Sequence, residues 1–334
     1  MKVAIVHDDL VQWGGAERVL EGICKIFPEA PIFTSVFDRS NLELNKRFGS
    51  KKVTTSFLQD IPGWKSLYKA LLPFYPIAFE QFNFNDYDLV ISHTTRFAKS
   101  IITKPKTKHI CYCHTPPRFL WHFSGEKAYG IGELLMSKLR IYDQVSARRV
   151  DHFIAGSQNA QERIKKVYGR DCELVYPFID LERFSGVDTF DGGYFVVIAR
   201  SNKYKRVDLA KNACKKIGVE LKVISGGMDD RMVMAVLAGC RALIVPGIED
   251  FGLVSLEAQA LGKPVVAYRA GGALETVKEE VTGLFFDQQT GDSLKEALIK
   301  LNYKKFKPKD CQDNARRFGK DKFIKNFKQA IASL

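Results

Sequence analysis

The sequence predicts an α/β protein with two domains, each built on a parallel sheet that helices cover on both faces. The first observation is the length, because 334 residues at roughly 150 residues per domain correspond to about two domains. The second is that short apolar runs alternate with helical patterns, which is typical of parallel strands buried on both faces. The third is that this alternation stops near residue 180 and restarts near residue 194.

The first half opens with a strand, a glycine turn and a helix. The apolar run Val3–His7 is followed by a loop that ends in Gly14 and Gly15, and then by a helical pattern over Ala16–Ile26. Later apolar runs bounded by polar or turn residues predict further strands at Ile32–Val36, Leu89–Ser92, Ile110–Cys113 and Phe153–Ala155.

The second half repeats this organisation after a linker. Residues 180–193 are rich in glycine and aspartate and have no sustained apolar pattern, so we place the linker there, between domains 1–179 and 194–319. Ligands of open α/β sheets bind outside the carboxyl ends of the strands, so two facing Rossmann-like domains would enclose a ligand cleft. We expect strands at Tyr194–Ala199, Leu221–Ser225, Ala242–Pro246 and Val265–Tyr268, and helices around Leu256–Leu261 and Leu294–Leu301.

Composition limits the class of protein. The 46% of hydrophobic and 27% of charged residues are typical of a folded globular chain. The sequence has no uninterrupted apolar run of about 18 residues, as a membrane span requires, and its first residues lack the apolar core of a signal peptide. We therefore expect a cytoplasmic protein whose seven cysteines are reduced.

The net charge of +13 is concentrated in residues 300–334, which contain 11 basic and 3 acidic residues. This excess suits a polyanionic partner, such as nucleic acid, an anionic membrane surface or a phosphorylated substrate. A solvated basic helix is the alternative that needs no partner. Since no helix-turn-helix, zinc or RNA-reading aromatic motif accompanies the charge, we expect no nucleic acid partner.

The segment Trp64–Phe84 is strongly apolar and aromatic, and Pro73 and Pro76 prevent one long helix there. It is either a pair of short helices that pack on the first sheet, or a surface that enters the membrane interface or receives a lipid-linked acceptor.

The segment 246–272 carries the most informative candidate site. A strand ends at Pro246, Glu249 lies in the loop that follows, and a helix begins near Val254 with Glu257 in its first turns. The free backbone N–H groups of a helix N-terminus favour an anion such as phosphate, and carboxylates suit sugar or ribose hydroxyls. This arrangement indicates a nucleotide-sugar site.

Two cations precede this segment. Arg200 ends a predicted strand, and Lys205 follows five residues later at the entry to a helix. Both would reach the same sheet edge as the Glu249 loop, where they would neutralise a diphosphate. A lone surface cation is the alternative for Arg200.

Four segments together resemble the retaining glycosyltransferases of family 4, which have the GT-B fold. They are the Glu249–Glu257 run, ARSNKYKRVDLA, the glycine pair before AERV, and HFIAGSQNAQERIKKVYG. The stretch HICYCHTPPRFLW resembles more narrowly the O-antigen mannosyltransferase branch of that family. The resemblance implies two Rossmann-like domains facing across a cleft, with a C-terminal helix, residues 320–334, crossing back to the acceptor-side first domain.

The resemblance also implies roles for individual residues. Glu249 would contact the transferred sugar near the reacting carbon, and Glu257 the ribose. His114 would approach the donor sugar from the first domain. The remaining contacts would be made to the diphosphate or the acceptor, by the cations Arg200 and Lys205, the backbone of Phe251, Gly252, Leu253 and Val254, and the close-approaching backbone of Gly14 and Gly15.

The expected reaction is retaining transfer of a sugar, with mannose from GDP-mannose favoured, to a lipid-linked or cell-envelope glycan. A UDP-sugar donor and a catalytically silent sugar-binding or scaffold subunit are the alternatives. Front-face displacement needs no protein nucleophile, whereas inverting chemistry would need a general base, for which His114 or Asp9 are the candidates.

No cofactor or metal is expected. Asp86 and Asp88 form an aspartate pair of the kind that binds divalent cations, but they precede their apolar strand, so a strand-entry turn is favoured. The six histidines show no metal-ligand spacing. The protein would therefore act as a peripheral enzyme on the cytoplasmic face of the membrane without a metal ion.

Overall fold

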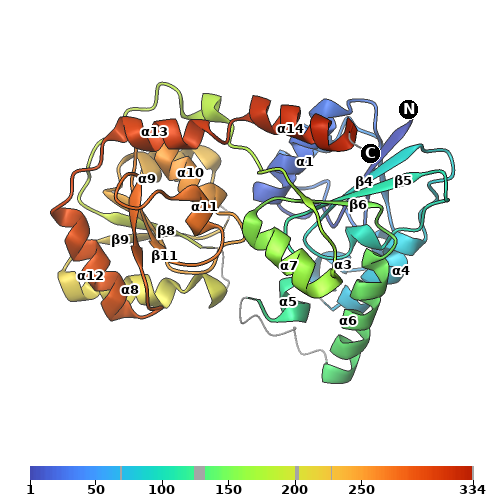
Figure 1. The fold of residues 1–334 in the computed structure, drawn as a ribbon, viewed down its shortest axis with the longest axis horizontal. Helices are drawn as coiled ribbons and strands as arrows, with labels where there is room; N and C mark the ends of the chain where they lie inside the picture. Colours follow the sequence, from blue (N-terminus) through green and yellow to red (C-terminus); the bar gives the residue numbers. More distant parts are fainter. Residues whose placement is uncertain (68–69, 124–131, 200–202, 227, 333–334) are drawn as a thin grey trace. The chain divides into compact units, whose positions relative to one another are not determined.

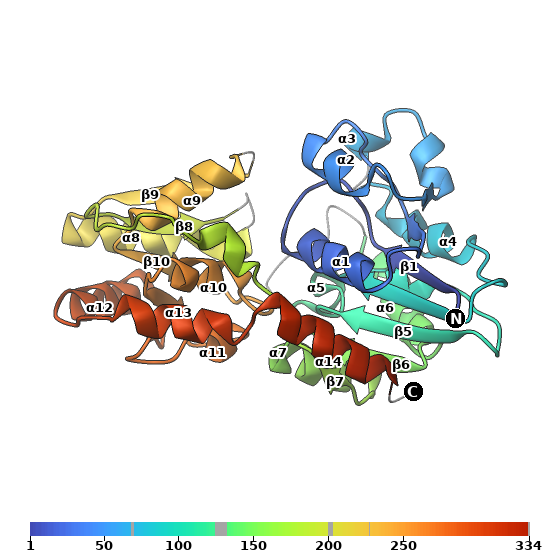
Figure 2. The same cartoon turned by 90° about the horizontal axis from the view of Figure 1, so that it is seen from above.

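The computed structural model describes residues 1–67, 70–123, 132–199, 203–226 and 228–332. Contacts divide the chain into two compact units, one comprising Met1–Tyr176 and Ile324–Leu334 and the other Pro177–Phe323. Each unit is a parallel sheet with helices on both faces, as predicted (Figures 1 and 2). Residues 180–193, where we placed a linker, belong to the second unit.

The described part of the first unit contains a seven-stranded sheet in the order β3-β2-β1-β4-β5-β6-β7, in which neighbouring strands are parallel. Its strands are β1 (Val3–His7), β2 (Ile32–Thr34), β3 (Val53–Thr55), β4 (Leu89–Thr94), β5 (Lys108–Cys113), β6 (His152–Ala155) and β7 (Glu173–Leu174). Its helices are α1 (Gly15–Ile26), α2 (Leu42–Phe48), α3 (Trp64–Leu67), α4 (Tyr75–Glu80), α5 (Arg118–Trp121), α6 (Glu133–Ala147) and α7 (Gln158–Tyr168).

Short 3-10 turns complete this unit at η1 (Phe57–Asp60), η2 (Leu72–Phe74) and η3 (Ala98–Ser100). The central strands β1 and β4 are buried along their whole length, which explains why continuous apolar runs predict them. The predicted strands of this half are confirmed, with ends that differ by at most two residues.

The described part of the second unit contains a five-stranded sheet in the order β12-β11-β10-β8-β9, again with parallel neighbours. Its strands are β8 (Phe195–Ile198), β9 (Leu221–Ile224), β10 (Ala242–Val245), β11 (Val265–Tyr268) and β12 (Gly283–Phe286). Its helices and 3-10 turns are η4 (Leu181–Phe184), η5 (Lys203–Lys205), α8 (Val207–Ile217), α9 (Asp230–Ala238), α10 (Leu253–Ala260), α11 (Ala273–Thr276), α12 (Gly291–Asn302) and α13 (Pro308–Arg316).

The last helix, α14 (Lys320–Ala332), begins in the second unit, and from Ile324 onward it belongs to the first. This agrees with the crossing helix that the resemblance implies. Phe327 is fully buried and its ring lies 5.9 Å from that of Tyr112 in β5. Phe327 therefore helps to hold the helix on the first sheet.

The aromatic segment Trp64–Phe84 packs largely on the first sheet, which confirms the helical interpretation. Tyr75 and Phe79 of α4 are buried in one cluster with Ala4, Val6 and other residues of the sheet. Outward-facing members of the segment stay exposed, including Phe74 at 49% and Ile77 at 57%.

None of the described helices is long and apolar enough to cross a membrane. All seven cysteines are free. Six of them are buried and Cys172 is half-buried, which agrees with the expectation of reduced thiols.

Candidate functional site

The second unit has a topological switch point at the carboxyl ends of β8 and β10. From β8 the chain continues to β9 on one side, and it later returns to β10 on the other side. Ligands of open α/β sheets bind at such a point. The loops that leave these two strands carry Arg200 and Lys205 after β8, and Glu249 after β10. Arg200 lies outside the described residues.

Lys205 and Glu249 form an ion pair between these two loops. Both side chains are largely shielded from solvent, with exposed fractions of 15% and 14%. Gly247 allows the close approach, because a Cβ there would lie 2.3 Å from the carbonyl oxygen of Tyr204 and 2.9 Å from the Cα of Lys205. The structure therefore brings the predicted cation and the predicted carboxylate together at the switch point.

Helix α10 begins directly after the Glu249 loop. Gly252 precedes it with a φ of 97°, a left-handed conformation that glycine adopts without the steric cost of a Cβ. The adjacent Phe251 is buried, and its ring lies 5.4 Å from that of Phe318. The first N–H groups of a helix lack acceptors within it, so those of Leu253 and Val254 favour an anion.

A second loop, which follows β11, fixes the Glu249 loop from the other side. The backbone N–H of Gly272 donates to the carbonyl oxygen of Glu249 at 2.8 Å. A Cβ on Gly272 would lie 2.2 Å from the Cα of Phe251. Backbone contacts on both sides thus position the Glu249 carboxylate.

Glu257 projects from α10 and pairs with Arg183, whose guanidinium lies 3.5 Å from its carboxylate and 3.2 Å from that of Asp230. Arg183 lies in η4, within the predicted linker, and is not among the predicted site residues. An arginine beside two distant acids has no sequence spacing that would reveal it. The pair holds Glu257 beside η4, while Glu249 pairs with Lys205.

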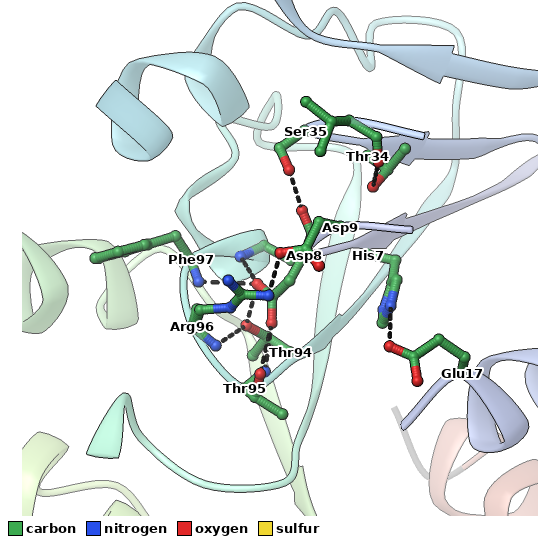
Figure 3. Close-up of polar contacts among 12 residues, drawn as sticks. His7, Asp8, Asp9, Glu17, Thr34, Ser35, Thr94, Thr95, Arg96 and Phe97 are labelled. Atoms are coloured by element: carbon green, nitrogen blue, oxygen red, sulfur yellow. Dashed lines mark hydrogen bonds and ion pairs between the residues drawn. The ribbon is translucent and has the colours of Figure 1, made fainter. Parts of the chain in front are cut away.

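The first unit has its own switch point, between β1 and β4. Buried charged side chains lie there (Figure 3). One Asp8 oxygen accepts hydrogen bonds from the Thr94 hydroxyl at 2.9 Å and from the N–H groups of Phe97 and Ala98 at 2.9 and 2.8 Å. The other accepts from the N–H of Thr95 at 2.6 Å. Asp8 therefore ties the β4 loop to the end of β1.

The pKa values of the adjacent carboxylates Asp8 and Asp9 are shifted in opposite directions. Burial would raise the pKa of Asp8, but Arg96, His7 and the backbone donors outweigh it and lower that pKa. Asp9 pairs with Arg96, yet burial dominates and raises its pKa. Asp9, the candidate base for inverting chemistry, is thus buried and engaged with an arginine.

The other predicted residues of the first unit lie along the same edge of its sheet. Gly14 is the N-cap of α1 in extended backbone, and Gly15 is the first residue of that helix. His114 directly follows β5, and its N–H donates to the carbonyl oxygen of Thr94 at 3.0 Å. His114 Nε2 lies 2.7 Å from Nε2 of His93.

The aspartate pair before β4 adopts the predicted turn. Asp86 lies in the turn and Asp88 directly precedes the strand, where its carboxylate accepts from the N–H of Lys2 at 2.6 Å. In the part of the chain that the structure describes, no three His, Cys, Asp or Glu side chains are grouped as a metal site requires.

Comparison with known proteins shows the relationship. A family model described as Glycosyltransferase Family 4 matches residues 13–183, and one described as Glycosyl transferases group 1 matches residues 194–318. An uncharacterized glycosyltransferase, MJ1607, of Methanocaldococcus jannaschii is 33% identical over 30% of this chain and 25% of its own. Alpha-1,3/1,6-mannosyltransferase ALG2 of Saccharomyces cerevisiae is 24% identical over 54% of this chain and 50% of its own. The chain thus aligns with half or less of these relatives.

A solved structure shares the fold across the whole chain. Anabaena Alr3699/HepE, crystallised with UDP and glucose, superposes with a TM-score of 0.72 at 19% identity and 100% coverage of both chains. This likeness agrees with the two parallel sheets of the GT-B fold. Since the Family 4 model matches just over half of the residues and the group 1 model most of the remainder, the chain belongs to glycosyltransferase family 4.

Proposed function

We propose that the protein is a retaining, metal-independent glycosyltransferase that transfers mannose from GDP-mannose to a lipid-linked or cell-envelope glycan. The observation that carries this proposal is the Lys205–Glu249 pair at the β8/β10 switch point, next to the N-terminus of α10. A cation, a carboxylate and helix N–H groups at one sheet edge supply what a sugar diphosphate needs.

In this proposal the diphosphate is held by Lys205, by Arg200 and by the N–H groups of Leu253 and Val254. When the donor binds, its phosphate oxygens compete for the Lys205 ammonium. The Glu249 carboxylate then turns to the sugar hydroxyls near the reacting carbon. Glu257, held by Arg183, accepts hydrogen bonds from the ribose hydroxyls.

The transfer step is a front-face displacement. The acceptor hydroxyl oxygen forms a bond to the anomeric carbon while the bond from that carbon to the diphosphate breaks, and its electron pair goes to the leaving phosphate. The acceptor proton passes to the departing phosphate oxygen. Positive charge at the diphosphate stabilises this charge separation, so the step requires neither a protein nucleophile nor a metal ion.

Two nucleotide sugars, GDP-mannose and a UDP-sugar, are alternatives for the donor. The resemblance to O-antigen mannosyltransferases and the mannosyltransferase name of ALG2 support GDP-mannose. The complex of HepE with UDP and glucose supports a UDP-sugar in a related fold. A catalytically silent subunit is disfavoured, since Lys205, Glu249 and Glu257 are all present.

A thermal-shift panel of GDP, UDP, GDP-mannose and UDP-sugars tests the donor. A ligand at 100 times its dissociation constant stabilises the folded protein by about 2.7 kcal/mol, so GDP and GDP-mannose should raise the melting temperature and UDP compounds should not. Stabilisation by UDP compounds alone would replace mannose with the alternative donor. Stabilisation by none would remove the enzymatic proposal.

The same preparation tests the metal. Transfer should continue in EDTA, because Lys205, Arg200 and the α10 N-terminus supply the positive charge. Activity that EDTA abolishes and magnesium or manganese restores would overturn metal independence.

A further inference from the structure

Three histidines on neighbouring strands of the first unit form a continuous hydrogen-bonded chain. His7 ends β1, His93 lies in β4 and His114 follows β5, and these strands are adjacent in the sheet. His7 Nδ1 lies 2.9 Å from His93 Nδ1, and His93 Nε2 lies 2.7 Å from His114 Nε2. Both ring nitrogens of His93 are therefore used within the chain.

The inner end of the chain meets a carboxylate. His7 Nε2 lies 3.8 Å from the Glu17 carboxylate of α1, and Figure 3 shows the two side chains directed at each other. His7, Glu17 and His93 are buried, whereas His114 is half-buried. The chain therefore runs from a buried acid to a partly accessible imidazole.

A neutral imidazole has one N–H donor and one acceptor nitrogen. If His93 donates to one of the two neighbouring histidines, it must therefore accept from the other. If neutral His7 directs Nε2–H at Glu17, its Nδ1 accepts from His93 Nδ1–H. His93 Nε2 then accepts from His114 Nε2–H, and His114 Nδ1 carries a lone pair.

Protonation of His7 reverses this order. Its Nδ1–H then donates to His93 Nδ1, which at 2.9 Å is nearer than the His93 carbonyl oxygen at 3.3 Å. His93 therefore carries its proton on Nε2 and donates to His114 Nε2. His114 then holds its own proton on Nδ1. One proton on His7 thus converts His114 Nδ1 from an acceptor to a donor, while His93 stays neutral throughout.

We propose that the Glu17–His7 pair, acting through His93, selects the tautomer in which His114 meets the donor sugar. Glu17, His7 and His93 are positioning residues in this device, and only His114 would touch the substrate. The inference rests on the proposed function, and on the contact of His114 with the donor sugar that the family resemblance implies.

The surrounding charges favour a proton on His7 and none on His93. Burial lowers the pKa of His7, but the Glu17 carboxylate, followed by Asp8 and Asp9, outweighs burial and raises it. Arg96, from the loop after β4, pairs with Asp9 and offsets part of that negative charge.

Around His93 the balance is the reverse. Burial, followed by repulsion from His114 and His7, holds the pKa of His93 well below the usual value. The neighbouring ring of Tyr112 is stacked on His93 at 5.6 Å, and burial raises the pKa of its hydroxyl, so it remains neutral. His93 is thus suited to relaying a hydrogen-bond direction without becoming charged.

Nuclear magnetic resonance of the full chain labelled with 15N-histidine, without donor, tests the device directly. Long-range 15N–1H correlations distinguish the two tautomers and the imidazolium. As pH falls, His7 should become charged, His93 should stay neutral, and His114 should change from the Nε2–H to the Nδ1–H tautomer with the midpoint of His7. A single His114 tautomer across the titration, or a charged His93, would overturn the proposal.

Glu17→Gln supplies the variant, because it removes the charge and keeps the shape. The shared midpoint of His7 and His114 should move to lower pH by on the order of one unit. Glu21→Gln is the matched control, since Glu21 is one turn further along α1 and pairs with Lys25 and Arg47 instead. Equal shifts in both variants would contradict a specific role for Glu17.

The pH dependence of sugar transfer tests whether the tautomer of His114 affects the reaction. In Glu17→Gln the acid limb of kcat/KM should shift in step with the His114 tautomer, and an unshifted limb would overturn the proposal. Failure of the proposed function is distinguishable, because absence of donor binding in the thermal-shift panel leaves the tautomer measurement intact.

Discussion

At the scale of single residues, Glu249 and Glu257 of the second unit have different partners. Their substitution should therefore impair different properties of the enzyme. Glu249 pairs with Lys205 in the loop, whereas Glu257 pairs with Arg183. Glu249→Gln keeps the shape and a hydrogen-bonding oxygen but removes the charge near the reacting carbon. We expect kcat to fall on the order of 100-fold with nucleoside diphosphate affinity nearly unchanged.

Glu257→Gln should weaken nucleotide binding by roughly tenfold, the equivalent of about 1.4 kcal/mol, with a smaller effect on kcat. Isothermal titration with the nucleoside diphosphate and steady-state kinetics measure both variants, each of which serves as the control for the other. Loss of the same property to the same degree in both would refute the division of roles.

A buried histidine outside the chain of three makes stability depend on pH. His109 is fully buried in β5, with Nε2 2.8 Å from the Ser92 hydroxyl, and burial lowers its pKa to about 4. The unfolded chain takes up this proton near pH 6.5 and the folded protein does not. The free energy of unfolding should therefore fall as pH decreases from about 6.5 to about 4.

His109→Gln should remove this dependence, so that between about pH 6.5 and about pH 5 the variant loses about 2 kcal/mol less than the wild type. Urea unfolding at the two pH values measures it, and the exposed His122→Asn is the control. Equal losses in all three proteins would contradict the assignment. His7 acts in the opposite sense, because its raised pKa gives stability that is present at low pH and lost as pH rises through the folded pKa.

At the scale of elements, the close approach of the two site loops at Gly247 should be sensitive to a single methyl group. A Cβ on Gly247 would meet backbone atoms of Tyr204 and Lys205, which cannot move aside as a flexible side chain would. Gly247→Ala should cost about 2 kcal/mol of stability and reduce transfer by displacing Lys205 from Glu249.

Melting temperature and kcat/KM measure this effect. Gly132→Ala at the N-cap of α6 is the control, because a Cβ there meets no atom of the described residues within 4 Å and its φ is −58°. A Gly247→Ala protein as stable and active as that control would show that the close approach of the loops is unimportant.

The strands that could be predicted are those buried on both faces, because they leave continuous apolar runs such as Val3–His7. The strands that were missed are short or lie at a sheet edge. β3 is half-buried and spans Val53–Thr55, β7 has two residues, and β12 at Gly283–Phe286 is an edge strand. The apolar GLFF run of β12 is nonetheless a strand signal in the sequence.

The candidate site could be predicted where its residues share one local segment. Glu249 and Glu257 lie around one strand-to-helix junction, so spacing reveals them. Arg183 and the His7–His93–His114 chain could not be predicted, because residues tens of positions apart meet only through the order of the strands. Topology, which periodicity does not supply, decides those contacts.

At the scale of the whole molecule, the proposed peripheral attachment has two candidate surfaces on opposite faces of the first sheet. Side chains of a strand alternate between faces. The face of Ala4 and Val6 carries η2 and α4, with the exposed Phe74 and Ile77. The opposite face, where Tyr112 meets Phe327, carries α14 with the exposed lysines 325 and 328.

A flat bilayer can meet one of these faces at a time, and we expect the basic one. Each lysine near an anionic surface contributes about 1 kcal/mol, so Lys325→Gln with Lys328→Gln should weaken binding to anionic vesicles roughly 30-fold. Ile77→Ser should leave it unchanged. Sedimentation with anionic and neutral vesicles at low and high salt measures it.

Absence of binding to anionic vesicles at low salt would remove the membrane proposal and leave the transferase proposal standing. Binding that Ile77→Ser abolishes and the lysine changes do not would move the attachment to the α4 face.

The division of the chain also sets the order in which it can be completed during synthesis. The second unit is a continuous stretch of chain, Pro177–Phe323, whereas the first is interrupted by it and ends with part of α14. Phe327 therefore leaves the ribosome after every residue of the second unit. Although its sheet is synthesised first, the first unit must wait with Tyr112 uncovered until the second has been made, so truncation within α14 would damage the domain that is encoded earliest.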